Sequence, residues 1–560
     1  MTKKSNKSDA SFLIQGSILA VASIISRIVG LLYRVPLTAT IGKTGNDYYG
    51  TAYEIYNIIL LISSYSIPLA VSKLVSARVS NQKFKDAYKV LCSALVFAII
   101  TGGLASCIVF FGAEFFTGVC LKTPLAAIAL KVLAPTLFIV AILGVIRGFF
   151  QGLGTMIPSA ISQVIEQIIN AIVSVVAANL LFSYGKKVGA VLGDKNNYAA
   201  AFGAAGGTLG TLTGAVFALV FLIFIFFAYK KVFKKLIQKD KSKENEGFYT
   251  IFSLLIMTCI PVLLSTTVYN ISSIIDQGIF KNISVIQGYD KKQISEFWGV
   301  FTGQYKVLIN VPISIASALA ASTVPSLTSA YYSGDQERVK KQIIMGDRFI
   351  MIVAFPCAIG MAVLASPIMQ LLFRDNDSTS ALMLIVGSCS IVFYSISTLS
   401  NAILQGIDKL SVPVFNAVIA LVAHLFVLIL LLCVFRLNIF AVIGANAFYA
   451  LLMCYLNGKA VKKYSNVKYD IGLIFVKPFI AAAIMGFFVY LSYRLIYAIL
   501  CLNMSNSIAN AIGCIVAIIV GGIIYFAALL LVKGIDDAIL AKIPGGKFIS
   551  KIAYSLHLLR

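Results

Sequence analysis

Long apolar runs recur along almost the whole chain, and they constrain its fold more than any other feature. A run of about 20 apolar residues is long enough for a helix to cross the hydrocarbon core of a bilayer. Only 12% of the residues are charged, roughly half the fraction found in soluble domains. A soluble globular enzyme is therefore excluded, and we predict an all-α polytopic membrane protein.

The apolar runs predict about fourteen transmembrane helices. The expected spans are 11–40, 48–79, 90–111, 125–145, 158–182, 200–229, 248–280, 297–332, 348–373, 378–404, 412–435, 439–461, 474–497 and 507–532. We interpret the first run as a span and not as a cleaved signal, because its apolar pattern continues past the small residues that imitate a cleavage site.

Lysine and arginine give the chain a formal net charge of +24. In a soluble protein this excess would suggest nucleic acid as a partner, but here it lies mostly in short loops, as on the cytoplasmic side of membrane proteins. Placing the N-terminus inside collects most of the basic loops on one side, with Lys186 and Lys187 as the main deviation. We expect both termini in the cytoplasm and no nucleic-acid partner.

A basic stretch at 230–243 divides the chain near its middle, and an internal repeat supports this division. The order Gln151, Gly152, Pro158 recurs as Gln405, Gly406, Pro413, which suggests duplication of a unit of about six helices. The expected parts are a six-helix lobe at 1–229, a basic cytoplasmic linker at 230–247, a second six-helix lobe at 248–461, two C-terminal helices within 462–533 and a basic amphipathic cytoplasmic tail at 534–560.

Arg27 and Arg34 lie inside the first span, where charge is costly and therefore indicates function. Seven residues make two helical turns, so both arginines project from one helix face. Two guanidinium groups on one face suit the oxygens of a diphosphate. Alternatively, Arg34 extends to the nearer membrane interface and Arg27 pairs with a buried acid, namely Glu54, Glu166 or Asp276.

The fifth span carries a polar stripe at helical spacing, formed by Gln163, Glu166, Gln167 and Asn170. Such a stripe faces an aqueous path or another helix and not lipid. Both a ligand cavity and simple hydrogen bonding between helices fit this pattern. Lys306, near the start of the eighth span, adds positive potential or extends to the interface.

Asp276 is the only acid in the seventh span and follows three hydroxyl residues, 265–267. A carboxylate with hydroxyl oxygens suits Na⁺ or a proton relay, although an acid at a helix end near the outer surface fits equally. The sequence contains no nucleotide-binding loop and no hydrolase motif. We therefore expect no enzymatic activity, no cofactor other than Na⁺ or H⁺ as a coupling ion, and no other metal.

Four motifs occur together in the order found in one family: SRIVG at 26–30, RGFFQG at 147–152, NISSIID at 270–276 and VPSL at 324–327. Over its full length the chain resembles the MurJ and SpoVB-type lipid II flippases of the MATE-like (MOP) exporter superfamily. This resemblance implies two lobes around a central cationic cavity containing Arg27 and Lys306. It also implies a groove for the lipid tail beside the last two helices, and a cation site at Asp276 and Asn416.

The resemblance further implies a monomer in the bacterial cytoplasmic membrane that carries an undecaprenyl-diphosphate-linked saccharide. Our hypothesis is a flippase, with lipid II as the first candidate and teichoic-acid, capsular or other polysaccharide precursors as alternatives. A MATE-type exporter of cationic drugs is a further alternative, and a membrane-embedded transferase lacks any recognisable catalytic loop. The expected substrate-binding residues are Arg27, Arg34, Lys306, Glu54, Gln163, Glu166, Gln167 and Asn170.

Overall fold

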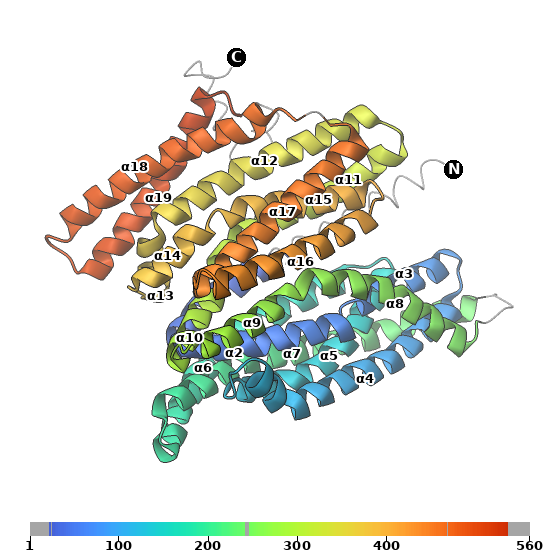
Figure 1. Ribbon diagram of the computed structural model, residues 1–560. Coiled ribbons are helices and arrows are strands. Elements are labelled where there is room, and N and C mark those ends of the chain that lie inside the picture. Colours follow the sequence, from blue (N-terminus) through green and yellow to red (C-terminus); the bar gives the residue numbers. More distant parts are fainter. Residues whose placement is uncertain (1–21, 24, 241–245, 468, 536–560) are drawn as a thin grey trace. The chain divides into compact units, whose positions relative to one another are not determined.

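The computed structural model describes residues 22–535 apart from 24, 241–245 and 468. Within these residues the chain is helical and contains no strand, which confirms the all-α prediction (Figure 1). The predicted tail and most of the first span's N-terminal half lie outside the described residues.

The chain forms two compact units, and the division between them in the sequence falls between Gly303 and Gln304. Each unit is described by itself. The first unit opens with a helical segment at 22–32. Its further helices are α2 (Arg34–Ser63), α3 (Ile67–Ser80), α4 (Phe84–Glu114), η1 (Phe115–Cys120), α5 (Ala126–Gly152), α6 (Ile157–Leu192), α7 (Lys195–Lys239), α8 (Phe248–Asn270), α9 (Ser272–Ile286) and α10 (Lys291–Val300).

The π-helical turn η2 (Phe301–Tyr305) joins α10 to the second unit. The helices of that unit are α11 (Lys306–Tyr332), α12 (Gln336–Val363), α13 (Ala365–Phe373), α14 (Ser378–Gly387), α15 (Ser390–Gly406), α16 (Ser411–Cys433), α17 (Ile439–Ser465), η3 (Gly472–Val476), α18 (Lys477–Leu500) and α19 (Asn506–Leu531). In the structure α8 to α10 belong to the first compact unit. The internal sequence repeat instead predicts that the second lobe begins at 248. The predicted lobe boundaries stay a prediction.

Eleven helices of the described chain are long and apolar enough to cross a membrane. They correspond to predicted spans two to six and nine to fourteen. The remaining predicted spans are interrupted in the structure or extend beyond the described residues: α8 and α9 share 248–280, and α10, η2 and α11 share 297–332. The count of fourteen stays a prediction.

The first two predicted spans are connected by a kinked helix and not by the loop that the sequence predicts between 40 and 48. The structure continues helically through the expected loop, with a kink at Gly42, where φ is 70°. Glycine adopts this left-handed backbone without the steric cost that a Cβ would impose. The kink redirects the chain without a loop, so the helix resumes directly after Gly42 and carries Asp47 in its second turn.

The two repeated motifs occupy matching places in the fold. Gly152 ends α5 and Pro158 lies in the first turn of α6, while Gly406 ends α15 and Pro413 lies in the first turn of α16. Proline suits a first helical turn because its missing N–H would have no helical partner there. The sequence similarity therefore corresponds to two similar helix–turn–helix junctions.

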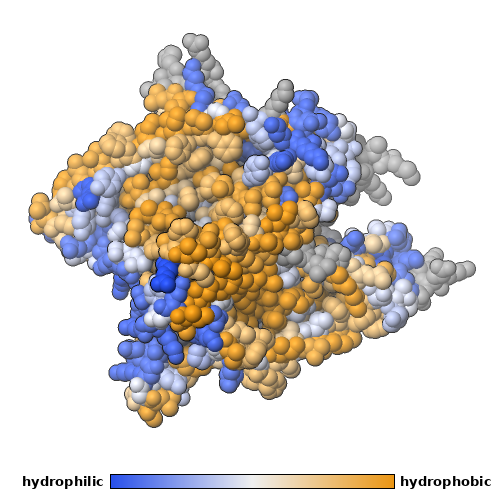
Figure 2. Space-filling model, in the orientation of Figure 1, coloured by the Kyte–Doolittle hydropathy of each residue, from blue (hydrophilic) through white to orange (hydrophobic). Residues whose placement is uncertain are grey.

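Large apolar side chains are both buried and exposed in this protein. In the first unit Leu37, Tyr49 and Leu133 belong to a buried core, whereas Phe111 is 81% exposed. In Figure 2 apolar residues cover the flanks of the helices and hydrophilic residues gather near helix ends. Exposed apolar surface of this extent suits contact with lipid, in agreement with a multi-pass membrane protein.

The basic stretch after the sixth predicted span is partly helical, because α7 continues to Lys239. Asp240 and Glu246, on either side of the segment 241–245, contact the adjoining ends of α4 and α3. The backbone N–H of Lys85 donates to Asp240 at 2.8 Å, and Arg78 forms an ion pair with Glu246. These contacts attach the stretch to the first unit on both sides.

Candidate functional site

The guanidinium group of Arg34 lies over aromatic rings of α2 in the first unit. Its Cζ is 4.4 Å from the ring centre of Tyr49 and 5.7 Å from that of Tyr53. The hydroxyl groups of Tyr33 and Tyr49 are 3.4 Å apart. Stacking on an aromatic face stabilises a cation and leaves the N–H edge of the guanidinium group free to donate. Arg34 is thus held by the protein.

The helical segment at 22–32, of which residue 24 is not described, lies beside α6 at Ser23 and Gly30. Ser23 Oγ donates to Gln163 Oε1 at 3.2 Å, and a Cβ on Gly30 would lie 3.6 Å from Gln167 Oε1. Arg27 falls between Ser23 and Gly30 on the same helix face. The arginine therefore lies at the level of the polar stripe, and its side chain is exposed.

Glu166 of the polar stripe has a basic partner that the sequence did not suggest. Arg147 of α5 donates from Nη2 to Glu166 Oε2 at 2.8 Å and from Nε to Ser162 Oγ at 2.9 Å. From the sequence we interpret Arg147 mainly as a charge that sets membrane orientation, with gating as the alternative role, because it lies at the cytoplasmic turn between the fourth and fifth predicted spans. The two residues lie on facing helices, so Glu166 is neutralised by Arg147.

Asn170, at the other end of the stripe, takes part in hydrogen bonds between helices. Its Oδ1 accepts from Ser174 at 2.9 Å and from Thr211 of α7 at 3.4 Å. Thr211 also contacts the hydroxyl group of Tyr53. The stripe therefore links α6 to α7 and α2, which is the interhelical alternative for this residue.

Glycines set the close approach of α7 to α6. Gly206, Gly210 and Gly214 repeat every four residues, and a Cβ at any of them would lie within 2.6 Å of an atom of α6. Small residues at this spacing let helix backbones pack tightly in membranes. This packing holds the polar stripe in position.

The remaining predicted site residues are distributed over both units. Glu54 accepts a hydrogen bond from Ser273 of α9 at 2.7 Å in the first unit. Asp276 is buried in α9, and Lys306 is the first residue of α11 in the second unit. A common cavity for Arg27, Arg34 and Lys306 stays a prediction.

Asn416 belongs to a chain of amides in the second unit. Its Nδ2 donates to Asn457 Oδ1 at 2.9 Å, and Asn457 Nδ2 donates to Asn401 Oδ1 at 2.6 Å. Asn416 is thus held in a chain of hydrogen bonds that links α16, α17 and α15. A shared cation site with Asp276 stays a prediction.

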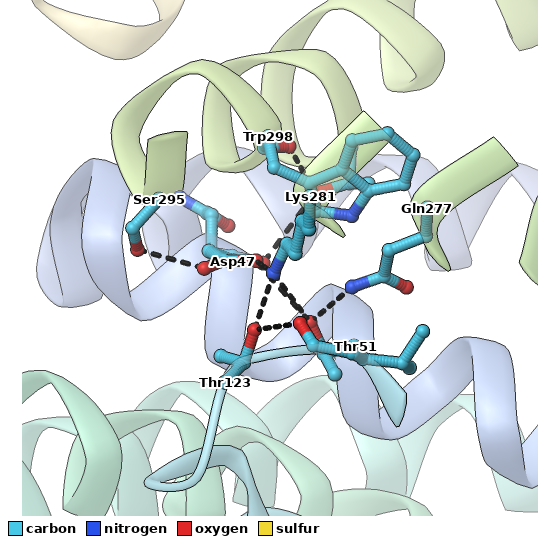
Figure 3. Close-up of polar contacts among 10 residues, drawn as sticks. Asp47, Thr51, Thr123, Gln277, Lys281, Ser295 and Trp298 are labelled. Carbon is cyan, nitrogen blue, oxygen red and sulfur yellow. Dashed lines mark hydrogen bonds and ion pairs between the residues drawn. The ribbon is translucent and has the colours of Figure 1, made fainter. Parts of the chain in front are cut away.

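A buried ion pair in the first unit was not predicted from the sequence. Lys281 of α9 and Asp47 of α2 are both about 1% exposed, and Lys281 Nζ lies 2.5 Å from Asp47 Oδ1. Lys281 also donates to Thr123 Oγ1 at 2.5 Å and to Thr51 Oγ1 at 3.3 Å, so all three ammonium protons have acceptors (Figure 3). Ser295 donates to the second carboxylate oxygen of Asp47 at 2.7 Å.

This cluster connects segments that are far apart in the sequence. Gln277 contacts Thr51, and Trp298 of α10 lies beside the pair (Figure 3). The cluster forms one wall of a cavity of about 220 Å³ that is also lined by Lys122 and Lys292. Asp47 and Lys281 lie just outside the ends of predicted spans. From the sequence, both are therefore expected to be solvent-exposed charges in loops. No local spacing could have paired them.

Glycine also permits the approach of α10 to α2 beside the cluster. A Cβ on Gly299 would lie 1.8 Å from the carbonyl oxygen of Lys43, and one on Gly303 would lie 2.4 Å from the Asn46 side chain. A Cβ on Gly299 would overlap the backbone of Lys43, and a Cβ on Gly303, in the adjoining η2 turn, would displace the Asn46 side chain. The two helices therefore pack at a separation that only glycine allows.

Long apolar helices with buried charged and amide groups place the chain in the class of polytopic helical membrane proteins. Solved structures agree with this class. A lipid II flippase MurJ in an inward closed conformation matches with a TM-score of 0.64 at 17% identity, covering 91% of this chain and 97% of that one. An inward-facing multidrug resistance MATE family transporter of the MOP superfamily matches with a TM-score of 0.62 at 15% identity, covering 79% and 94%. The chain thus has the fold of these transporters.

The chain belongs to the polysaccharide biosynthesis protein family, whose model matches residues 13–331. Two relatives come from Bacillus subtilis (strain 168). The lipid II flippase MurJ is 23% identical over 74% of this chain and 76% of its own length. Stage V sporulation protein B is 24% identical over 73% and 75%. These relatives confirm the resemblance identified from the motifs.

Proposed function

We propose that the chain flips an undecaprenyl-diphosphate-linked saccharide across the bacterial cytoplasmic membrane by alternating access, with lipid II as the first candidate. The relatives named as lipid II flippases support this substrate class. A precursor of teichoic acid, capsule or another polysaccharide is the alternative within the same class. Transport depends on membrane potential or an ion gradient, since the sequence offers no nucleotide site.

The charge balance around the first helix is the observation that carries the proposal. Three arginines, Arg27, Arg34 and Arg147, stand against two glutamates, Glu54 and Glu166. Glu166 is already paired with Arg147 at 2.8 Å. Among these five residues one net positive charge remains, which favours an anionic ligand over the cations that a drug exporter carries.

The two remaining arginines have complementary properties. Arg34 is held against Tyr49, whereas Arg27 is exposed beside the polar stripe. Seven residues correspond to a rise of about 10 Å along the helix, so the arginines can contact different parts of one headgroup. We propose that Arg27 contacts the diphosphate, because bidentate charge-assisted bonds suit phosphate oxygens. Gln163 and Gln167 then offer amides to the neighbouring sugar.

Ion coupling is the remaining part of the proposal. Asp276 and Asn416 supply oxygen atoms that suit Na⁺, and Asp276 can alternatively carry a proton. Both residues are buried in the structure, so a bound ion would exchange only when the surrounding helices move. Alternating access provides such a movement.

Complementation tests the role of Arg27. The chain is depleted in its own host while variants are expressed, and the undecaprenyl-linked precursors that accumulate are identified. Arg27→Ala should fail to restore transport, and Arg27→Lys should fail nearly as fully if the guanidinium geometry matters. Lys73→Ala is the control, because Lys73 is an exposed cation of α3. Full complementation by Arg27→Ala at normal protein level would refute the headgroup assignment, and accumulation of no polyprenyl-linked precursor on depletion would refute the function.

A further inference from the structure

A second polar cavity lies between α11 and α12, entirely within the second unit. It measures about 450 Å³ and its lining includes the cations Arg338 and Lys341. The two acids at this end of α12 are engaged elsewhere: Asp335 accepts from the backbone N–H of residue 338 at 3.0 Å, and Glu337 pairs with Lys340 at 2.9 Å. The mouth of the cavity is therefore positively charged.

The same cavity presents hydrogen-bond acceptors. Thr323 donates its hydroxyl proton to the carbonyl oxygen of Leu319, and Ser326 donates to that of Thr323. Each hydroxyl oxygen keeps lone pairs that can accept. Gln342 Oε1 is buried and has no hydrogen-bond donor among the described residues. Buried acceptors are normally satisfied, so the cavity suits a ligand that carries hydroxyl donors.

The floor of the cavity is apolar and continues along the two helices. Leu319, Met345 and Phe349 line it. Leu319 and Phe349 also line a much smaller cavity of about 10 Å³ bounded by Pro312 and Val353, so the apolar lining continues between the helices beyond the main cavity. Cations beside an apolar lining match the chemistry of a lipid where its charged headgroup meets its aliphatic chains.

We propose that this cavity binds an anionic glycerophospholipid whose headgroup carries hydroxyl groups, the class of phosphatidylglycerol. Arg338 and Lys341 would hold the phosphodiester, and Gln342 Oε1 would accept from a headgroup hydroxyl. Basic pockets between transmembrane helices bind anionic lipid headgroups in this way.

The size of the cavity favours this occupant. About 450 Å³ lies within the range for one small ligand, which suits a glycerophosphate headgroup and is small for a saccharide of several rings. On the predicted orientation the mouth faces the cytoplasmic leaflet. The site is thus a binding site for a membrane lipid and does not depend on which saccharide the chain carries.

Lipid binding to the purified full chain tests the proposal. Native mass spectrometry in detergent would compare phosphatidylglycerol with phosphatidylethanol, an anionic phosphodiester that lacks headgroup hydroxyl groups, and with zwitterionic phosphatidylcholine. We expect phosphatidylglycerol to bind most tightly, phosphatidylethanol less tightly and phosphatidylcholine least tightly. The double variant Arg338→Gln/Lys341→Gln should bind phosphatidylglycerol on the order of thirtyfold more weakly, because two charges beside an anionic lipid are lost.

A second variant separates the hydroxyl contact from the charge. Gln342→Leu should weaken phosphatidylglycerol roughly fivefold through one lost hydrogen bond and leave phosphatidylethanol unchanged. Lys340→Gln is the matched control, because Lys340 is on the same turn but does not line the cavity.

Three outcomes would overturn the proposal. The first is phosphatidylglycerol binding to the double variant as to the wild type. The second is equal binding of all three lipids. The third is displacement by undecaprenyl phosphate or by inorganic phosphate at concentrations that match the lipid, which would assign the site to the transported substrate or to any anion. A monodisperse double variant with normal helix content shows that weak binding is not a folding defect.

Discussion

Replacing Lys281 with methionine should destabilise the protein strongly, because it leaves the Asp47 carboxylate buried without its cation. Both side chains are about 1% exposed, and the ammonium group donates to Asp47, Thr51 and Thr123. Methionine fills similar space but donates no hydrogen bond. Removing one partner of a buried ion pair typically costs about 3–5 kcal/mol, which is a large fraction of the stability of most folded proteins.

A double variant distinguishes the loss of the pair from the loss of packing. Lys281→Met combined with Asp47→Asn removes both charges and keeps an acceptor for Ser295, so it should be more stable than Lys281→Met alone. Lys292→Met is the control, because Lys292 forms an exposed 3.9 Å pair with Glu296. An exposed pair one helical turn apart contributes only about 0.3–0.5 kcal/mol.

The assay is equilibrium denaturation in detergent, followed by the fluorescence of Trp298, the only tryptophan in the sequence. Trp298 is fully buried in this cluster, and its ring lies 5.6 Å from that of Phe280. Its emission therefore reports the opening of this region. If Lys281→Met lowers the free energy of unfolding no more than Lys292→Met does, the ion pair does not stabilise the unit and the reasoning is wrong.

Two further predictions concern packing and topology. Gly299→Ala should lower the melting temperature in detergent, because its Cβ would lie 1.8 Å from the Lys43 carbonyl oxygen. Gly522→Ala is the control, since a Cβ there would have no atom within 4 Å. Equal melting temperatures of the two variants would contradict the close packing at Gly299. In a background without native cysteines, a cysteine within 230–239 should resist an impermeant thiol reagent in intact cells while one at Lys291 reacts, and the reverse pattern would invert the orientation.

The sequence alone was sufficient to predict the class of fold. Hydropathy is a local property, so apolar runs predict membrane helices without knowledge of their partners. The repeated Gly152 and Gly406 turns could also be placed, because glycine and proline mark helix ends. Consecutive helices such as α8 and α9 were predicted as one span, since a single-residue break at Ile271 leaves hydropathy unchanged.

The sequence was sufficient to predict which residues belong to the candidate site, but not which side chains contact each other there. A polar stripe on an apolar helix predicts that Glu166 and Asn170 face an aqueous path or another helix and not lipid. Only the structure shows that Arg147 neutralises Glu166 and that Thr211 contacts Asn170. Arg34 was assigned either to a ligand or to the membrane interface, and its place over Tyr49 depends on how the kinked helix folds back.

Membrane insertion follows from the sequence because the bilayer selects for apolar length, a property that each segment carries by itself. Charge pairing does not, because it depends on which helices approach each other. Asp47 and Lys281 meet only after α2 and α9 pack, and glycines such as Gly299 allow the neighbouring approach of α10. In a low-dielectric interior each such charge requires a partner, and the tertiary structure alone decides which residue that partner is.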